Sequence, residues 1–302
     1  MFTVRLPKTG VLTAILAGCL LLAACDKEPS GASEAEKAAG RENVEAMARE
    51  HTGDTADPSP AAEIDPTAAV ISDSKMPYVE VDDQNVYGYF SAPSDVFEPL
   101  PALIVIHEWW GLNDNVRAMA ERLAAEGYMV LAVDLYGGKT ANTTAEAQAL
   151  MREVVENPEL ARDNLRGAYE FLTTAGAPRI GSLGWCFGGG WSLSTAQLFP
   201  EELDAAVIYY GAVTADQDRL RPINTPILGL FAANDASIKV ESVEAFRSAL
   251  EQLRKDYEIH VYPGVGHAFA NPTGRNYDER AATDAWDRTL EFLGRHLTTD
   301  GS

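Results

Sequence analysis

Cysteine and basic residues are scarce in this sequence. Its 302 residues contain three cysteines, of which Cys19 and Cys25 lie close to the N-terminus. The rest of the chain holds a single cysteine, Cys186, and so cannot form an internal disulfide. Lysine and arginine number 24 against 45 aspartates and glutamates, which gives a net charge of -21. Because the basic residues form no cluster, this balance excludes a nucleic-acid partner that needs a basic patch.

Long apolar runs are scarce as well, and the one near the N-terminus, Val11–Ala24, is too short to span a bilayer comfortably. Two basic residues precede it and small residues end it, a pattern typical of an export signal. The segment Leu22-Ala23-Ala24-Cys25 resembles the lipobox of bacterial lipoproteins, whose cysteine is acylated. We therefore predict a signal peptide over residues 1–24 and a lipid anchor on Cys25, which would hold the protein in the bacterial cell envelope with its folded domain in the periplasm. The alternative is an ordinary secretory signal cut nearby.

Residues 25–75 are rich in Ala, Glu, Ser, Asp and Pro, a composition typical of a disordered segment. The stretch from Glu42 to His51 has the pattern of a helix, but its apolar stripe consists of Val44 and Met47 alone. We predict a mostly disordered tether here, followed by one folded domain over residues 76–298.

Cys186 lies between an apolar run and a glycine-rich segment, Gly184-Trp185-Cys186-Phe187-Gly188-Gly189-Gly190. This pattern predicts a strand, a sharp turn and a helix, with glycines two positions before and after the cysteine where the backbone is most crowded. The arrangement is a nucleophile elbow, in which the helix N-terminus favours a thiolate at the apex. The alternative is an inert core cysteine. Glycines at the start of a helix argue against it, because they fill no core.

Beyond residue 76, short apolar runs alternate with amphipathic stretches. The predicted strands are Tyr78–Val81, Val86–Phe90, Leu103–Ile106, Tyr128–Val133, Ile180–Gly184, Ala206–Tyr210, Pro226–Phe231 and Tyr257–Tyr262. Their alternation with helices predicts a mostly parallel sheet of about eight strands, covered by helices on both faces. With two antiparallel edge strands in front, this is the α/β-hydrolase fold. Only Gly211–Thr225 separates two strands where this fold usually inserts a lid, so we predict no large lid domain and an open site.

Two polar residues follow later strands of the predicted sheet. Asp235 follows the strand that ends at Phe231, and His267 follows the strand that ends at Tyr262. The order nucleophile, acid, base is that of the α/β-hydrolase fold. We predict a catalytic triad in which His267 takes the proton of Cys186 and Asp235 orients the imidazole. A turn aspartate and a loop histidine are the alternatives.

An acyl-transfer site also needs two N–H donors aimed at one oxyanion. The backbone N–H groups of Phe187, directly after the nucleophile, and of Trp109, after the strand at Leu103–Ile106, are the candidates. Glu108 places a carboxylate in the same loop, where the alternative is a solvated charge. Trp109, Trp110 and Phe269 are expected to line a shallow apolar cleft.

Four segments together resemble the dienelactone hydrolase family, also called carboxymethylenebutenolidases. They are Val105-Ile106-His107-Glu108-Trp109-Trp110-Gly111-Leu112-Asn113, Ala132-Val133-Asp134-Leu135-Tyr136, Gly184-Trp185-Cys186-Phe187-Gly188-Gly189 and Gly266-His267-Ala268-Phe269. The resemblance covers about Pro77 to Leu297. It implies a triad of Cys186, His267 and Asp235, an oxyanion hole at Trp109 and Phe187, and a Glu108 that contacts the resting thiol. It also implies that no metal or cofactor is used.

Well-known members of the family hold the substrate carboxylate with residues that this chain does not have at the corresponding positions. Gly137-Gly138-Lys139 stands where the family has an arginine, and Ala268-Phe269-Ala270-Asn271 follows the histidine. Lys139 and Arg275 are the candidate replacements. The sequence thus predicts a hydrolase that cleaves small esters or lactones through an acyl-thioester, with a small molecule as its partner. The alternatives are a thiol redox protein using Cys186, which lacks a resolving cysteine, and a catalytically silent binding lipoprotein.

Overall fold

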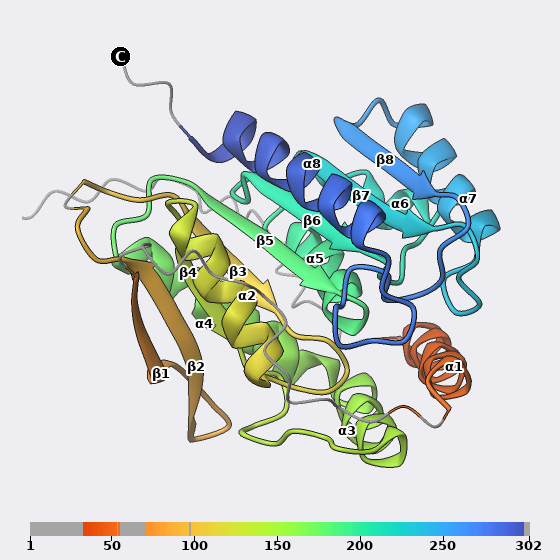
Figure 1. The fold of residues 1–302 in the computed structure, drawn as a ribbon, viewed down its shortest axis with the longest axis horizontal. Helices are drawn as coiled ribbons and strands as arrows, with labels where there is room; N and C mark the ends of the chain where they lie inside the picture. The colour runs from red at the N-terminus through yellow and green to blue at the C-terminus, as the bar shows by residue number, and fades with distance from the viewer. Residues whose placement is uncertain (1–32, 53, 55–69, 97, 299–302) are drawn as a thin grey trace, which may run out of the picture. The chain divides into compact units, whose positions relative to one another are not determined.

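Eight strands form one sheet in the described part of the chain (Figure 1). The structure is a computed structural model, and it describes residues 33–52, 54, 70–96 and 98–298, all within the compact unit Ala32–Ser302. The strands are β1 (Val70–Val81), β2 (Gln84–Pro93), β3 (Ala102–Ile106), β4 (Met129–Val133), β5 (Ile180–Trp185), β6 (Ala205–Tyr209), β7 (Ile227–Ala232) and β8 (Tyr257–Tyr262). Their order across the sheet is β1-β2-β4-β3-β5-β6-β7-β8.

The sheet is antiparallel at one edge and parallel elsewhere. β1 pairs with β2, and β2 with β4, in antiparallel register, whereas every later pair is parallel. The turn between β1 and β2 runs through Asp82 and Asp83, whose φ angles are 52° and 58°. Two consecutive positive φ values match the twist of a hairpin. In β3, β6 and β7 every residue is buried, which explains their uninterrupted apolar sequences.

Helices cover both faces of the sheet. They are α1 (Glu34–Glu50), α2 (Asp114–Ala125), α3 (Thr144–Glu156), α4 (Pro158–Thr174), α5 (Phe187–Leu198), α6 (Gln217–Leu220), α7 (Val240–Gln252) and α8 (Glu279–Leu297). In Figure 1, α2 and α8 lie in front of the sheet and α4 and α5 behind it. On the front face the Arg122 guanidinium of α2 lies 3.8 Å from the Trp286 ring centroid of α8. The predicted α/β-hydrolase fold is confirmed, and no large lid domain interrupts the described residues.

The predicted tether is wrong where the structure describes it. Residues 34–50 form α1, which begins with a capping box between Ser33 and Glu36 and packs against α3. The two apolar residues of its stripe, Val44 and Met47, are buried. β1 begins at Val70, before the expected domain boundary at residue 76. The remaining tether residues, the signal peptide and Cys25 lie outside the described residues.

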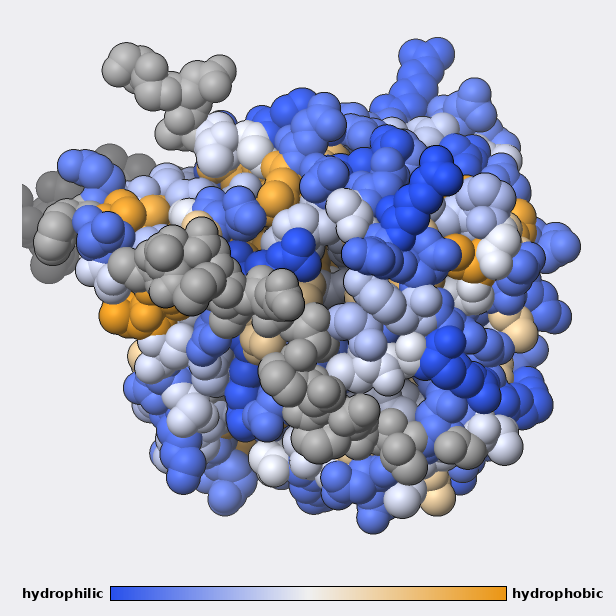
Figure 2. All heavy atoms as spheres, in the orientation of Figure 1, coloured by the Kyte–Doolittle hydropathy of each residue, from blue (hydrophilic) through white to orange (hydrophobic). Residues whose placement is uncertain are grey.

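The visible surface is mainly polar. Figure 2 shows hydrophilic residues over most of this face, with small and separate apolar patches between them. Few large apolar side chains are exposed among the described residues, for example Tyr87, Leu160 and Tyr277, as is normal for a folded domain. Among the helices that the structure describes, none combines the length and the apolar character needed to cross a membrane.

Candidate active site

Cys186 occupies a strained turn between β5 and α5. Its φ and ψ angles are 56° and -118°, a conformation that a residue with a side chain rarely adopts. A Cβ atom on Gly188 would lie 2.2 Å from the Ile106 carbonyl oxygen, and one on Gly184 would lie 2.2 Å from the Gly188 carbonyl oxygen. Only glycine fits these two positions, so the backbone has the form of the predicted nucleophile elbow.

Asp235 and His267 form a buried pair beside the elbow. Asp235 follows β7 and His267 follows β8, and their Oδ2 and Nδ1 atoms lie 2.7 Å apart with both side chains fully buried. The other carboxylate oxygen, Oδ1, accepts hydrogen bonds of 2.8 Å from the backbone N–H groups of Ser237 and Ile238. These bonds fix the carboxylate, which in turn fixes the orientation of the imidazole.

Cys186 and His267 face one another across the site. The Cys186 sulfur lies within 4.8 Å of a nitrogen of the His267 ring, and Nε2 of that ring is buried with no hydrogen-bond partner among the described residues. Burial lowers the pKa of His267, but the negative charges of Cys186 and Asp235 raise it by more, so the pKa lies well above 6.5. This environment favours the protonated, imidazolium form of His267.

Glu108 is buried in the loop after β3, so the alternative of a solvated charge is wrong. Its Oε2 accepts a 2.7 Å hydrogen bond from Nδ2 of Asn271. Burial raises the pKa of Glu108 to about 7, although the charge of His267 and the bond from Asn271 act in the opposite direction. Asn271 was not predicted, because its distance in sequence from Glu108 gives no sign that the two meet.

The loop that carries Trp109 is fixed from two sides. The backbone N–H of Leu135 donates to Nε2 of His107 at 3.1 Å, and Nδ1 of the same ring bonds the Glu108 carbonyl oxygen at 2.6 Å. The Tyr136 hydroxyl donates to the Trp109 carbonyl oxygen at 3.1 Å. Phe187 is the first residue of α5, so its N–H has no acceptor within the helix.

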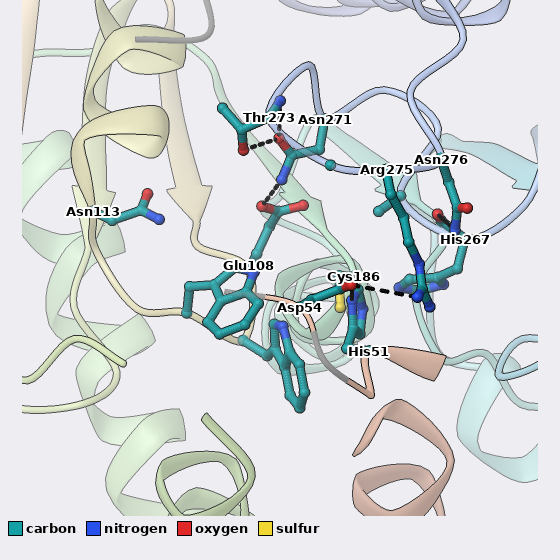
Figure 3. Close-up of a pocket in the computed structure, with 14 residues that line it drawn as sticks. His51, Asp54, Glu108, Asn113, Cys186, His267, Asn271, Thr273, Arg275 and Asn276 are labelled. Atoms are coloured by element: carbon teal, nitrogen blue, oxygen red, sulfur yellow. Dashed lines mark hydrogen bonds and ion pairs between the residues drawn. The ribbon is translucent and has the colours of Figure 1, made fainter. Parts of the chain in front are cut away.

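His51 enters the site from the turn after α1 (Figure 3). Its ring centroid lies 4.6 Å from that of Trp109 and 5.4 Å from that of His267, and its Nδ1 lies 3.0 Å from Oδ2 of Asp54. Burial, followed by the charge of His267, lowers the pKa of His51 to about 4. Sequence reasoning assigned His51 to the tether. The capping box and the apolar residues Val44 and Met47 indicate a helix. They do not indicate which part of the domain that helix packs against.

The site contains a cavity of about 250 Å³. Its lining residues are His51, Asp54, Glu108, Trp109, Trp110, Asn113, Cys186, His267, Ala268, Asn271, Thr273, Gly274, Arg275 and Asn276. Most of these side chains are polar, and two come from the segment after α1. The expectation of an apolar cleft is therefore wrong.

Comparison with known proteins assigns the family. Residues 86–297 match the dienelactone hydrolase family. The chain belongs to this family. A candidate carboxymethylenebutenolidase of Saccharolobus solfataricus is 33% identical over 257 residues, covering 72% of this chain and 97% of the relative. One of Escherichia coli K12 is 32% identical over 226 residues, covering 70% and 83%. The crystal structure of a candidate dienelactone hydrolase from Klebsiella pneumoniae shares 30% identity with a TM-score of 0.67, covering 75% of this chain and 99% of that one.

The protein is therefore a hydrolase of the ester and lactone class, and its predicted substrate residues divide into two groups. Trp110 and Arg275 line the cavity described above, as expected. Lys139 does not line it and instead pairs with Glu153 of α3 at 3.4 Å. Phe269 is fully buried, with its ring 4.9 Å from that of Tyr262. The predictions for Lys139 and Phe269 are wrong because the loops that carry them turn these side chains away from the cavity.

Proposed function

We propose that this dienelactone hydrolase family member cleaves small carboxylic esters or lactones through an acyl-thioester on Cys186. The observation that carries the proposal is the elbow cysteine beside a buried His267–Asp235 pair with a 2.7 Å hydrogen bond. A cysteine at φ 56° between two sterically required glycines is costly to maintain in a structural core. The cost is explained if the sulfur must stand clear of the sheet to attack a carbonyl carbon.

In the proposed reaction, His267 holds the proton of Cys186 and the thiolate attacks the substrate carbonyl. The N–H groups of Phe187 and Trp109 bind the oxyanion that develops on the carbonyl oxygen. Collapse of the tetrahedral intermediate expels the alkoxide, which takes the proton from His267. Water then gives a proton to His267 and attacks the thioester, releasing the acid and restoring the thiol. Asp235 stabilises the imidazolium in both halves of the reaction.

The cavity favours small and uncharged substrates. A volume of about 250 Å³ lies below the range of typical ligand pockets, roughly 300–1,000 Å³. Arg275 is the only lysine or arginine among the described residues that line it. Its guanidinium already contacts Asp54 at 3.5 Å and donates to the Glu50 carbonyl oxygen. Neutral esters and lactones are therefore expected to react faster than substrates that carry a carboxylate, such as dienelactone itself.

The test is hydrolysis of p-nitrophenyl acetate, dihydrocoumarin and cis-dienelactone by the full-length chain carrying Cys19→Ser and Cys25→Ser, which leaves Cys186 as the only thiol. We expect Cys186→Ala to lower kcat/KM by roughly 10⁴-fold or more. Mass spectrometry of the enzyme quenched with a slow ester should find the acyl group on the peptide containing Cys186. Turnover that survives in Cys186→Ala would refute the proposed nucleophile.

We also propose that Cys25 carries a lipid that anchors the protein in the cell envelope. The support is the lipobox-like segment Leu22-Ala23-Ala24-Cys25 after a short apolar run. Cells fed a labelled fatty acid should incorporate it into the wild-type chain and not into Cys25→Ser. Equal labelling of both chains would contradict the anchor.

A further inference from the structure

Three potential metal ligands converge in the cavity, and a fourth, the Met47 sulfur, lies beside one of them. One nitrogen of His51, one nitrogen of His267 and the Cys186 sulfur all lie within 4.8 Å of one another, and all three residues are buried. The thioether sulfur of Met47 lies 3.6 Å from the Cys186 sulfur. These side chains come from α1 and its following turn, from the elbow, and from the loop after β8. Only the tertiary structure brings them together.

Both imidazoles are oriented as metal-bound histidines usually are. Nδ1 of His51 lies 3.0 Å from a carboxylate oxygen of Asp54, and Nδ1 of His267 lies 2.7 Å from one of Asp235. A carboxylate on the outer nitrogen fixes the ring and its tautomer and leaves the inner nitrogen free to bind. The inner Nε2 atoms of both rings are buried and have no hydrogen-bond partner in the described ranges. His51 is 7% exposed and His267 is fully buried.

Binding of a metal ion to Cys186 and His267 releases one proton to solvent, because the ion binds the thiolate and the neutral imidazole.

We infer that Met47, His51, Cys186 and His267 form a binding site for copper(I). A thiolate and a thioether are soft donors that select copper(I) over harder ions, and two histidines, a cysteine and a weakly bound methionine are a known copper donor set. Zinc takes cysteine and histidine but does not use methionine as a usual ligand. The bound ion would occupy both the nucleophile and its base. Copper binding itself is independent of the proposed ester hydrolysis, whereas inhibition of hydrolysis by copper rests on it.

The test measures copper affinity directly. The full-length chain with Cys19→Ser and Cys25→Ser is titrated anaerobically with copper(I) against a chromophoric chelator, and separately with zinc. We expect one copper(I) per chain. Loss of a carboxylate that orients a metal-binding histidine typically lowers metal affinity about 10–100-fold. His51→Ala removes the histidine itself, so it should lower copper affinity by at least this factor. Met47→Leu, which nearly conserves side-chain volume, should lower the affinity for copper and not the affinity for zinc.

Two further variants keep the test decisive. Asp54→Asn retains all four ligands but removes the carboxylate that orients His51, so it should weaken copper binding by about 10–100-fold even if His51→Ala folds poorly. His260→Ala, on β8 and outside the cavity, is the matched histidine control and should bind as the parent chain does. Copper binding without ester hydrolysis would support the site and refute the proposed function. The site is refuted if the parent chain binds no copper(I), or if Met47→Leu and Asp54→Asn both bind it unchanged.

Discussion

Replacing Glu108 with glutamine should change how stability depends on pH. Burial raises the pKa of Glu108 from 4.5 to about 7, so the folded protein binds this proton more tightly than the unfolded chain does. Protonation of Glu108 therefore stabilises the folded state. This contribution to the free energy of unfolding is fully present below pH 4.5 and is lost as the pH rises through about 7. A pKa difference of about 2.5, at about 1.4 kcal/mol per unit, corresponds to about 3 kcal/mol. The glutamine side chain in Glu108→Gln keeps an oxygen for Asn271 and carries no proton to lose.

The assay is the free energy of unfolding in guanidinium chloride, measured for both proteins at about pH 5 and about pH 8. From about pH 5 to about pH 8, the free energy of unfolding of Glu108→Gln should rise by up to about 3 kcal/mol relative to that of the wild type. The other titrating groups are the same in both proteins, so their contributions cancel in this difference. Glu251→Gln, on the exposed side of α7, is the matched control. A stability difference between wild type and Glu108→Gln that is the same at both pH values would refute the reasoning.

Three other substitutions test separate parts of the structure, each by its free energy of unfolding. Gly188→Ala should destabilise by about 3 kcal/mol or more, because the new Cβ would meet the backbone oxygen of Ile106 at 2.2 Å; a smaller loss than in an exposed Gly→Ala control would contradict the crowded elbow. Tyr78→Phe should cost about 1–3 kcal/mol, because the buried N–H of Asp134 loses the hydroxyl it donates to at 3.2 Å; an unchanged value would mean that this bond contributes nothing. Val44→Ala should cost about 2 kcal/mol if α1 is part of the cooperative fold, and no change would indicate that α1 unfolds separately.

The elbow and the sheet could be predicted because their requirements are local. The glycines beside Cys186 are needed to relieve clashes within a few residues of the turn. The strands were recognisable because burial on both faces leaves few positions for polar residues. Asp235 and His267 followed from chain order, since loops after parallel strands meet at one edge of the sheet.

The contents of the cavity could not be predicted in the same way. Asn271 reaches Glu108 across 163 residues of sequence, and no spacing rule connects them. Lys139 and Phe269 lie near functional segments in sequence, but loop conformation decides whether a side chain turns toward the cavity or away from it. His51 depends on where α1 packs, which the sequence of α1 alone does not encode.

The packing of α1 shows which interactions position His51. Its ion pairs with the catalytic domain, such as Arg41 with Glu156 at 2.9 Å and Glu45 with Arg152, join side chains that are 40% to 50% exposed. Exposed pairs of this kind contribute about 0–1 kcal/mol each. Burial of Val44 and Met47, which are at most 1% exposed, contributes about 1.5–3 kcal/mol each. Burial of these two apolar side chains therefore contributes more free energy to the packing of α1 than these exposed ion pairs do. Because Met47 is also the residue that contacts Cys186, the interaction that holds α1 on the domain is the one that brings His51 to the Cys186 thiol.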